Sequence, residues 1–243
     1  MKKVVSYSLW GKQSKYLIGA VRNAELCPKI YPGWVARFYV GTSVPVEFRH
    51  RLSSLGAEVI QVNEPGDWRG MFWRFEAAID PEVEIMLSRD CDSRLSNREA
   101  SAVEEWLSSP ALFHIMRDHP YHDRSILGGM WGVKAPLLRN ITELIQQYPM
   151  GDFYQVDQDF LHEIVYPMVK DVSLVHDEFY EKCKYPTKRR GLEFVGQVFD
   201  ENDAPSIPFQ KILSDSLNQS FLNRAYRWIR LRIEKTGLLN LSC

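Results

Sequence analysis

The most constraining feature of this sequence is an alternation of short apolar runs with helical segments over its first part. Residues 4–9, 34–40 and 57–62 have the length and the β-branched or aromatic composition of strands. The intervening residues 16–27 and 46–55 have helical patterns that stop at proline or glycine. Because strands that are joined by helices pair in parallel, this order predicts an α/β fold with a mostly parallel central sheet flanked by helices.

The α/β pattern continues to residue 175. The segment 113–134 is an exception, because its glycines and polar residues fit no single element. Further elements are expected at strands 83–88 and 172–175 and at helices 70–78, 97–107, 141–148 and 157–165. We therefore expect a single domain over residues 1–200, with a connector and a C-terminal helix over 201–243 that packs on it.

The composition argues against a nucleic-acid-binding protein and against a membrane-spanning one. The 30 basic and 31 acidic residues nearly cancel, so the chain lacks the positive field of a protein that binds nucleic acid. Its 4 cysteines form neither a CxxC pair nor a disulfide framework, which favours a reducing compartment and hence the cytoplasm. No run approaches the roughly 18 apolar residues of a transmembrane helix. For the basic helix expected at 221–235, we favour packing over a peripheral membrane contact.

A pair of aspartates directly follows the apolar strand at 83–88. Asp90 and Asp92 therefore fall at the carboxyl end of a buried strand, where open α/β sheets bind their ligands. Carboxylate oxygens suit a hard divalent cation, and such a cation neutralises the diphosphate of a nucleotide-activated substrate. A solvated turn is the alternative, but the position after the strand favours a metal and diphosphate site.

Three arginines lie near these carboxylates in the sequence. Arg89 and Arg94 flank the aspartates, where they either bind phosphate and hold the carboxylates or form ordinary surface ion pairs. Arg74 stands among three aromatic residues. Because an unpaired guanidinium is costly to desolvate there, we expect a carboxylate partner for Arg74.

A glycine-rich segment follows at residues 128–134. Gly128, Gly129 and Gly132 let the backbone approach a ligand closely, because glycine has no Cβ atom. Trp131 would then face a sugar and Lys134 would reach phosphate. Tight turns in a buried loop explain the glycines without any ligand, and the sugar site is favoured through the family resemblance given below.

A second acidic pair, Asp157 and Asp159, is the expected source of the catalytic carboxylate. A carboxylate there would accept the proton of the acceptor hydroxyl or stabilise positive charge at the anomeric carbon. Helix capping is the alternative, and between the two residues we favour Asp159. His119 and His122 have a metal-like spacing but lack a second ligand pair, so we assign them to the acceptor side or to structure.

The order of these motifs resembles the metal-dependent glycosyltransferases of the GT-A fold. The motifs that carry the resemblance are RFEAA, IMLSRDCDSR, LGGMWGVK, DQDFL and VHDEF. They are similar to glycogenin-like and galactosyltransferase-like retaining enzymes, and closer to small glycosyltransferase domains of bacterial surface-glycan clusters and of large algal viruses, including a virus-encoded rhamnosyltransferase domain. The resemblance implies a Rossmann-like nucleotide-binding half at about residues 1–95 and an acceptor half at about 96–200.

The resemblance also implies roles for individual residues. Asp90 and Asp92 would bind the metal and the donor, with His176 as the third protein ligand; a polar residue at a strand end is the alternative for His176. The end of the first strand would hold the base and ribose of the donor. The residues concerned are Tyr7, Ser8, Leu9 and Trp10, for which a plain hydrophobic strand is the alternative.

These features together predict a glycosyltransferase that needs Mn2+ or Mg2+. It would move a hexose or deoxyhexose from a nucleoside diphosphate sugar, with UDP favoured, to a glycan hydroxyl. One alternative is a sugar nucleotidyltransferase, although the segment YSLWGKQSKY lacks the glycine-rich basic loop of that class. The other alternative is a non-catalytic module that binds a nucleotide sugar or a glycan. The sequence leaves open the sugar, the acceptor, the stereochemical outcome and the oligomeric state.

Overall fold

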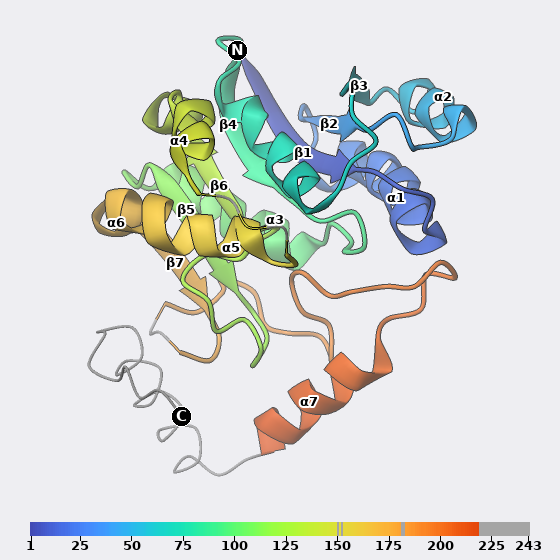
Figure 1. Cartoon of the computed structure of the whole chain (residues 1–243). Helices are drawn as coiled ribbons and strands as arrows, with labels where there is room; N and C mark the ends of the chain where they lie inside the picture. The colour runs from blue at the N-terminus through green and yellow to red at the C-terminus, as the bar shows by residue number, and fades with distance from the viewer. Residues whose placement is uncertain (150, 152, 181–182, 219–243) are drawn as a thin grey trace.

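The computed structural model of the protein describes residues 1–149, 151, 153–180 and 183–218, and within them seven strands form one sheet (Figure 1). The strands are β1 Lys2–Leu9, β2 Val35–Val40, β3 Glu58–Gln61, β4 Val83–Ser88, β5 Phe113–Arg117, β6 Trp131–Lys134 and β7 Ser173–Asp177. Their order across the sheet is β3-β2-β1-β4-β6-β5-β7. β6 runs antiparallel to β4 and β5, and the other neighbouring pairs are parallel. The predicted fold class is therefore confirmed.

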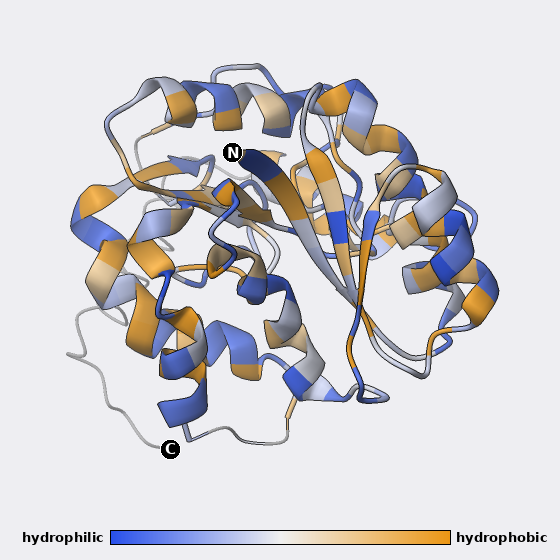
Figure 2. Ribbon diagram, turned by 90° about the horizontal axis from the view of Figure 1, so that it is seen from above, coloured by the Kyte–Doolittle hydropathy of each residue, from blue (hydrophilic) through white to orange (hydrophobic). Residues whose placement is uncertain are grey.

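Helices cover both faces of this sheet (Figure 2). One face packs against α1 Ser14–Ile30, α2 Val46–Ser54 and α3 Asn97–Ser108. The other packs against η1 Trp68–Ala78, η2 Ala135–Leu138, α4 Ile141–Gln147, α5 Val156–Phe160, η3 Leu161–Val165 and α6 Tyr166–Val169, which η4 Lys170–Val172 follows. α7 Ile207–Asn218 comes last among the described elements. Each face thus has its own hydrophobic core.

The side chains of β1 alternate between these two cores. Val5, Tyr7 and Leu9 enter the core with α1, whereas Val4 enters the core with η1. This period of two is the geometry of any strand. On the η1 side, Ser8 Oγ accepts a hydrogen bond from the backbone N–H of Arg74 at 2.9 Å. β1 therefore fixes η1 in place along the sheet.

The direction of β6 decides which residues reach the edge where the parallel strands end. Trp131, the first residue of β6, pairs with Ser88, the last residue of β4. The connection 118–130 therefore lies at the same edge as the carboxyl ends of β1, β4 and β5. Lys134 pairs instead with Ile85, toward the opposite edge.

The sequence predictions differ from the structure in several elements. The strand at 83–88 has its predicted bounds, but the predicted helix at 70–78 is a 3-10 helix that begins at Trp68. β5 and β6 were missed because β6 has only 4 residues and the connection between them is long and polar. α7 replaces the end of the predicted connector. The helix predicted at 221–235 lies outside the described residues, so its packing stays a prediction.

Within the described part of the chain, no helix is both long enough and apolar enough to cross a bilayer.

Candidate active site

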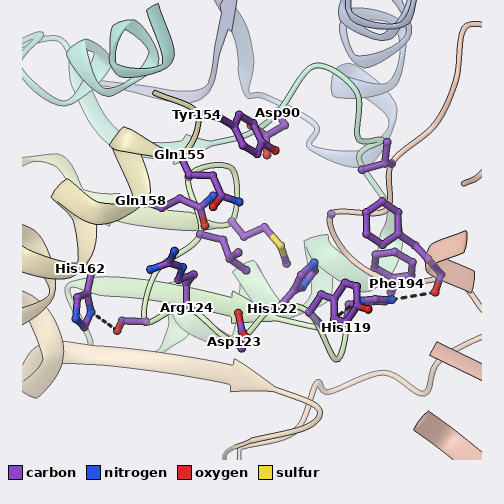
Figure 3. A pocket seen from close by; sticks show the side chains of 18 residues that line it. Asp90, His119, His122, Asp123, Arg124, Tyr154, Gln155, Gln158, His162 and Phe194 are labelled. Carbon is purple, nitrogen blue, oxygen red and sulfur yellow. Dashed lines mark hydrogen bonds between the residues drawn. The ribbon is translucent and has the colours of Figure 1, made fainter. Parts of the chain in front are cut away.

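Two cavities open at the edge where the parallel strands end. The smaller encloses about 290 Å3 between the ends of β1 and β4, the start of η1 and the segment 154–158. The larger encloses about 820 Å3 between the connection 119–130, the segment 154–162 and the segment 194–209 (Figure 3). The cavities adjoin, because six residues line both of them: Asp90, Gly128, Tyr154, Gln155, Gln158 and Val198.

Arg74 joins two carboxylates in the wall of the smaller cavity. Its Nη1 forms an ion pair with Asp90 Oδ1, and its Nη2 lies 2.8 Å from Asp157 Oδ2. Burial lowers the pKa of the Arg74 guanidinium, but the negative charges of Asp90 and Asp157 outweigh it, so this pKa lies above its ordinary value. The prediction of a carboxylate partner for Arg74 is confirmed, with two partners instead of one.

Asp90 and Asp92 both line the smaller cavity. The Asp90 side chain is 47% exposed at the junction of the two cavities, whereas the Asp92 side chain is 14% exposed and lies 3.1 Å from Lys15 Nζ. Burial, and then the negative charge of Asp90, raise the pKa of Asp92 above its ordinary value, while Lys15 opposes that rise. Two carboxylates that repel each other in this way favour the binding of a cation between them.

The donor set at this place fits Mn2+ or Mg2+ only if other ligands complete it. Asp90 and Asp92 supply hard oxygens, but among the described residues no group of three His, Cys, Asp or Glu side chains could hold a metal ion. Mg2+ is commonly held by one or two carboxylates together with substrate phosphates and water. Gly129 leaves room for the Asp90 carboxylate, because a Cβ atom at this position would collide with Asp90 Oδ2. The residues therefore fit a metal that arrives with a diphosphate.

His176, the predicted third metal ligand, lies elsewhere. Its Nδ1 is 2.8 Å from His114 Nε2, and its Nε2 is 3.4 Å from Glu105 on α3. It is fully buried and lines neither cavity. This prediction is corrected: the position of His176 on β7 turns its ring toward α3, away from the two aspartates.

Strand alternation also removes two predicted donor-binding residues from the site. Arg89 is 1% exposed and binds Glu99 on α3 at 2.7 Å. Its side chain therefore faces α3, whereas Asp90 faces the cavities. Tyr7 stacks on Phe38 in the α1 core with ring centroids 4.6 Å apart. Both predictions are corrected, because neighbouring residues of a strand point to opposite faces.

Lys134, which was predicted to reach phosphate, also lies away from the site. Its Nζ donates a hydrogen bond to the Ser109 carbonyl at 3.2 Å, and it lines a separate cavity with Lys3 and Glu84. The cause is the antiparallel direction of β6, which carries Lys134 away from the edge where Asp90 lies. Trp131 is also buried, stacked on Phe113, and it faces no cavity.

The remaining predicted donor-side residues do lie at the site. Ser8, Leu9 and Trp10 line the smaller cavity. Gly129 lies against Asp90, and a Cβ atom on the neighbouring Gly128 would collide with Asp157. Their contacts with a donor stay predictions.

The two candidate catalytic carboxylates differ in position. Asp157 is 2% exposed and lines the smaller cavity, and burial raises its pKa although Arg74 opposes the rise. Asp159 lies outside the residues that line either cavity, and its Oδ1 is 3.3 Å from Arg124. Asp157 therefore lies at the smaller cavity and Asp159 lies at neither cavity, and the catalytic role of either residue stays a prediction. Two residues along a helix differ by about 200°, so only one of them can face the cavity.

Several lining residues escaped the sequence analysis. Trp68 and Tyr154 form an edge-to-face pair, with ring centroids 5.4 Å apart, at the smaller cavity. Tyr16 also lines it, beside Lys15. Gln155, with φ of 73°, begins α5 in the left-handed region, which is uncommon for a residue other than glycine. In the sequence, the position of Gln155 shortly before Asp157 and Asp159 was the feature that could have identified it as a lining residue.

Comparisons with solved structures agree with the sheet topology described above. The chain has a GT-A-like glycosyltransferase fold. A solved glycosyltransferase involved in the glycosylation of the major capsid of PBCV-1 is 16% identical, with a TM-score of 0.50, and the match covers 96% of this chain and 100% of that chain. At this identity the likeness concerns the fold.

Two further solved structures have lower TM-scores. A mycobacterial protein is 15% identical, with a TM-score of 0.46; the match covers 72% of this chain and 64% of that one. Glucosyl-3-phosphoglycerate synthase from Mycobacterium tuberculosis, in complex with Mn2+, UDP-glucose and glycerol 3-phosphate, is 13% identical, with a TM-score of 0.46 and coverages of 97% and 80%. No protein-family model matches the sequence, and neither does any curated protein sequence.

Proposed function

We propose that the protein is a metal-dependent glycosyltransferase that moves a hexose or deoxyhexose from a nucleoside diphosphate sugar to a glycan hydroxyl. The observation that carries the proposal is the position of Asp90 at the junction of two cavities, beside Asp92 and paired with the buried Arg74. The GT-A-like fold supports the same class of reaction. The donor would occupy the smaller cavity and the acceptor the larger one.

The smaller cavity suits a nucleotide. Trp10, Tyr16 and Trp68 offer ring faces to a base, with Ser8 beside them, and we favour a uracil nucleotide there. Asp90 and Asp92 would hold Mn2+ or Mg2+ together with the diphosphate. Lys15 lies close to Asp92 and would contact the same phosphates.

The chain's own residues would orient the reaction. The metal, when bound, supplies Lewis acidity that neutralises the leaving diphosphate. Arg74 holds Asp90 and Asp157 in fixed positions, since it pairs with both. Asp157 would contact the transferred sugar, where its carboxylate stabilises positive charge at the anomeric carbon or accepts a proton. Its burial excludes water from one side of the sugar.

The larger cavity suits a glycan acceptor. Tyr121, Phe194 and Phe209 line it with aromatic rings, and Asp123 and Arg124 line it with hydrogen-bonding groups. Sugar rings pack on aromatic faces, and their hydroxyls need donors and acceptors together. The predicted acceptor-side histidines, His119 and His122, also line this cavity, where His119 additionally binds the Phe209 carbonyl at 2.9 Å.

A thermal-shift series with UDP, GDP and dTDP, each with and without Mn2+, tests the proposal. The favoured nucleotide should raise the melting temperature only when Mn2+ is present, because ligands that bind the native state stabilise it. Hydrolysis or transfer of the matching sugar donor then separates an enzyme from a binding module. Formation of a nucleotide sugar from a nucleoside triphosphate and a sugar phosphate would instead support the nucleotidyltransferase alternative.

We further propose that the protein works in a reducing compartment, the cytoplasm. Cys27 and Cys91 are buried, and their thiols donate hydrogen bonds to the carbonyls of Trp34 and Ser8. Buried cysteines that remain thiols are typical of proteins that do not depend on disulfides.

A further inference from the structure

The segment 194–206, which we call the strap, crosses the edge of the sheet beside the aspartate loop 90–93 (Figure 1, orange). The backbone N–H of Phe199 donates a hydrogen bond of 2.8 Å to the carbonyl of Asp92. Val198 lines both cavities, and Phe194 and Gly196 line the larger one. The strap therefore touches the proposed metal loop and the walls of both cavities.

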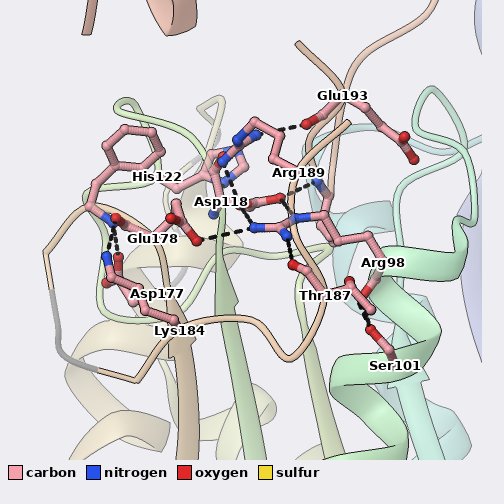
Figure 4. A network of polar contacts seen from close by, with 12 residues as sticks. Arg98, Ser101, Asp118, His122, Asp177, Glu178, Lys184, Thr187, Arg189 and Glu193 are labelled. Atoms are coloured by element: carbon pink, nitrogen blue, oxygen red, sulfur yellow. Dashed lines mark hydrogen bonds and ion pairs between the residues drawn. The ribbon is translucent and has the colours of Figure 1, made fainter. Parts of the chain in front are cut away.

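The first end of the strap is fixed by a buried charge network (Figure 4). Asp118, which follows β5 and is 0% exposed, accepts hydrogen bonds from Arg98 at 2.8 Å and from Arg189 at 2.6 Å. Its Oδ2 also accepts the backbone N–H of Val195 at 2.9 Å. A buried carboxylate with this many donors is a rigid anchor, because each unpaired donor would be costly.

The second end of the strap is fixed by Asp203. Its Oδ1 lies 2.8 Å from Arg94 Nη2 and 3.0 Å from Arg94 Nε, and its Oδ2 lies 2.7 Å from Arg22 Nε on α1. Asp203 has φ of 60°, in the left-handed region that aspartate and asparagine tolerate better than most side chains. Two arginines from different parts of the chain thus converge on one carboxylate.

Arg94 carries this contact into the aspartate loop. Its Nη1 donates to the carbonyl of Ser93 at 2.9 Å and to that of Cys91 at 3.4 Å, and its guanidinium lies 5.0 Å from the ring centre of Phe199. Asn23 on α1 binds the carbonyl of Ser93 from the other side, at 2.8 Å. The loop that bears Asp92 is therefore held between α1 and the strap.

We propose that Asp203 is a positioning residue for the metal and diphosphate site, a role that rests on the proposed function. It pairs with Arg94, which is 9% exposed at its side chain, and so keeps that guanidinium on the carbonyls of residues 91 and 93. The same contact holds the strap against the carbonyl of Asp92. Loss of the Asp203 charge would free the loop and the strap together, and both cavities would lose a common wall.

The variant Asp203→Asn tests this role, with Asp200→Asn as the matched control. Asparagine tolerates the left-handed backbone, so Asp203→Asn removes the charge and little else. Asp200 lies in the same segment, and its Oδ1 accepts the backbone N–H groups of Asn202 and Ala204, at 2.8 and 2.9 Å. An asparagine oxygen can replace those two contacts. Melting temperatures verify that both variants remain folded.

We expect Asp203→Asn to weaken the Mn2+-dependent binding of UDP by about tenfold, the usual scale for residues that orient metal ligands, while Asp200→Asn binds as the wild type does. Hydrogen exchange of the free protein should be faster over residues 194–206 and 90–95 in Asp203→Asn only. In turnover, KM for donor and acceptor should both rise, because the strap lines both cavities.

Two outcomes overturn the inference. One is an equal rate of hydrogen exchange over residues 194–206 and 90–95 in Asp203→Asn and Asp200→Asn. The other is faster exchange in Asp203→Asn with unchanged UDP affinity in the presence of Mn2+. Should the wild type bind none of UDP, GDP and dTDP with Mn2+, the proposed function fails instead. The exchange comparison, which needs no ligand, then decides alone whether Asp203 holds the aspartate loop.

Discussion

The two cavities differ in how they are built. The smaller one lies against the ends of β1 and β4, and its charged groups are paired and fixed, as Arg74 is between Asp90 and Asp157. The larger one is walled by connections between elements and carries exposed side chains such as Tyr121, which is 55% exposed. Under the proposed function, the catalytic step would take place at the sheet edge, and the connections between elements would select the acceptor.

The largest effect is expected when a carboxylate of the smaller cavity is removed. Asp92→Ala should lower metal-dependent turnover by a factor on the order of 10³, since charge stabilisation at the leaving group is lost. The steady-state rate over a Mn2+ titration measures it. Asp123→Ala, a carboxylate of the larger cavity, is the control and should keep its metal dependence. Full turnover by Asp92→Ala would show that the metal-dependent step does not require the carboxylates of the smaller cavity.

A smaller effect is expected from the second carboxylate of the same cavity. Asp157→Asn should lower kcat by about 10² while UDP binding changes little, as expected for a group used mainly in the transition state. Asp159→Asn is the matched control and should retain nearly the full rate. A larger loss of kcat in Asp159→Asn than in Asp157→Asn would instead identify Asp159 as the catalytic residue. Single-turnover rates make the comparison.

The larger cavity should respond through acceptor binding. Tyr121→Ala removes an exposed ring beside His119 and Phe209 and should raise KM for the acceptor by about tenfold, while KM for the donor stays constant. Initial rates at varied donor and acceptor concentrations separate the two constants. An equal rise in both would mean that the cavities do not divide the substrates as proposed.

His176 should affect stability and leave metal binding unchanged. His176→Gln disturbs the contact with His114 and should lower the free energy of unfolding by about 1–2 kcal/mol. Its affinity for UDP with Mn2+ should equal that of the wild type. Urea unfolding and nucleotide titration measure the two quantities. A large loss of metal-dependent affinity would return His176 to the metal site.

The smallest expected effect is a loss of stability on mild acidification. Burial, followed by the positive charges of His176 and Arg89, lowers the pKa of His114 well below its ordinary value of 6.5, and Glu105 faces only the other ring, His176. The unfolded state therefore binds the proton more readily. The stability is fully present above about pH 6.5 and falls below it by up to about 1.4 kcal/mol per pH unit. Urea midpoints between pH 5.5 and 7.5 that do not change would contradict this.

The sequence contained more about the site than was taken from it. The alternation of Val4, Val5 and Tyr7 along β1 shows which side chains share a face, and directly after β4 the side chains of Arg89 and Asp90 also point in different directions. This rule would have placed Tyr7 away from Ser8 and Arg89 away from Asp90. The fold class itself was predictable, because the helix and strand patterns of the first part are regular.

Other parts of the site could not be predicted from local patterns. The position of Lys134 depends on the antiparallel direction of β6, and the sequence of this 4-residue strand does not by itself determine that direction. His176 pairs with His114 across 62 positions, and Asp203 reaches Arg94 across 109. Contacts at such separations follow from the packing of whole elements, and a periodicity within one segment contains no information about them.

The antiparallel course of β6 has an evolutionary consequence. The chain returns through the connection 118–130, a hairpin arm whose ends are fixed by β5 and β6 but whose length the sheet does not constrain. Insertions and deletions within its middle part, residues 119–127, would remodel the proposed acceptor wall and leave Gly128, Gly129 and the residues of β1 and β4 in place. A lineage built on this scaffold is free to diversify its products through changes in one loop.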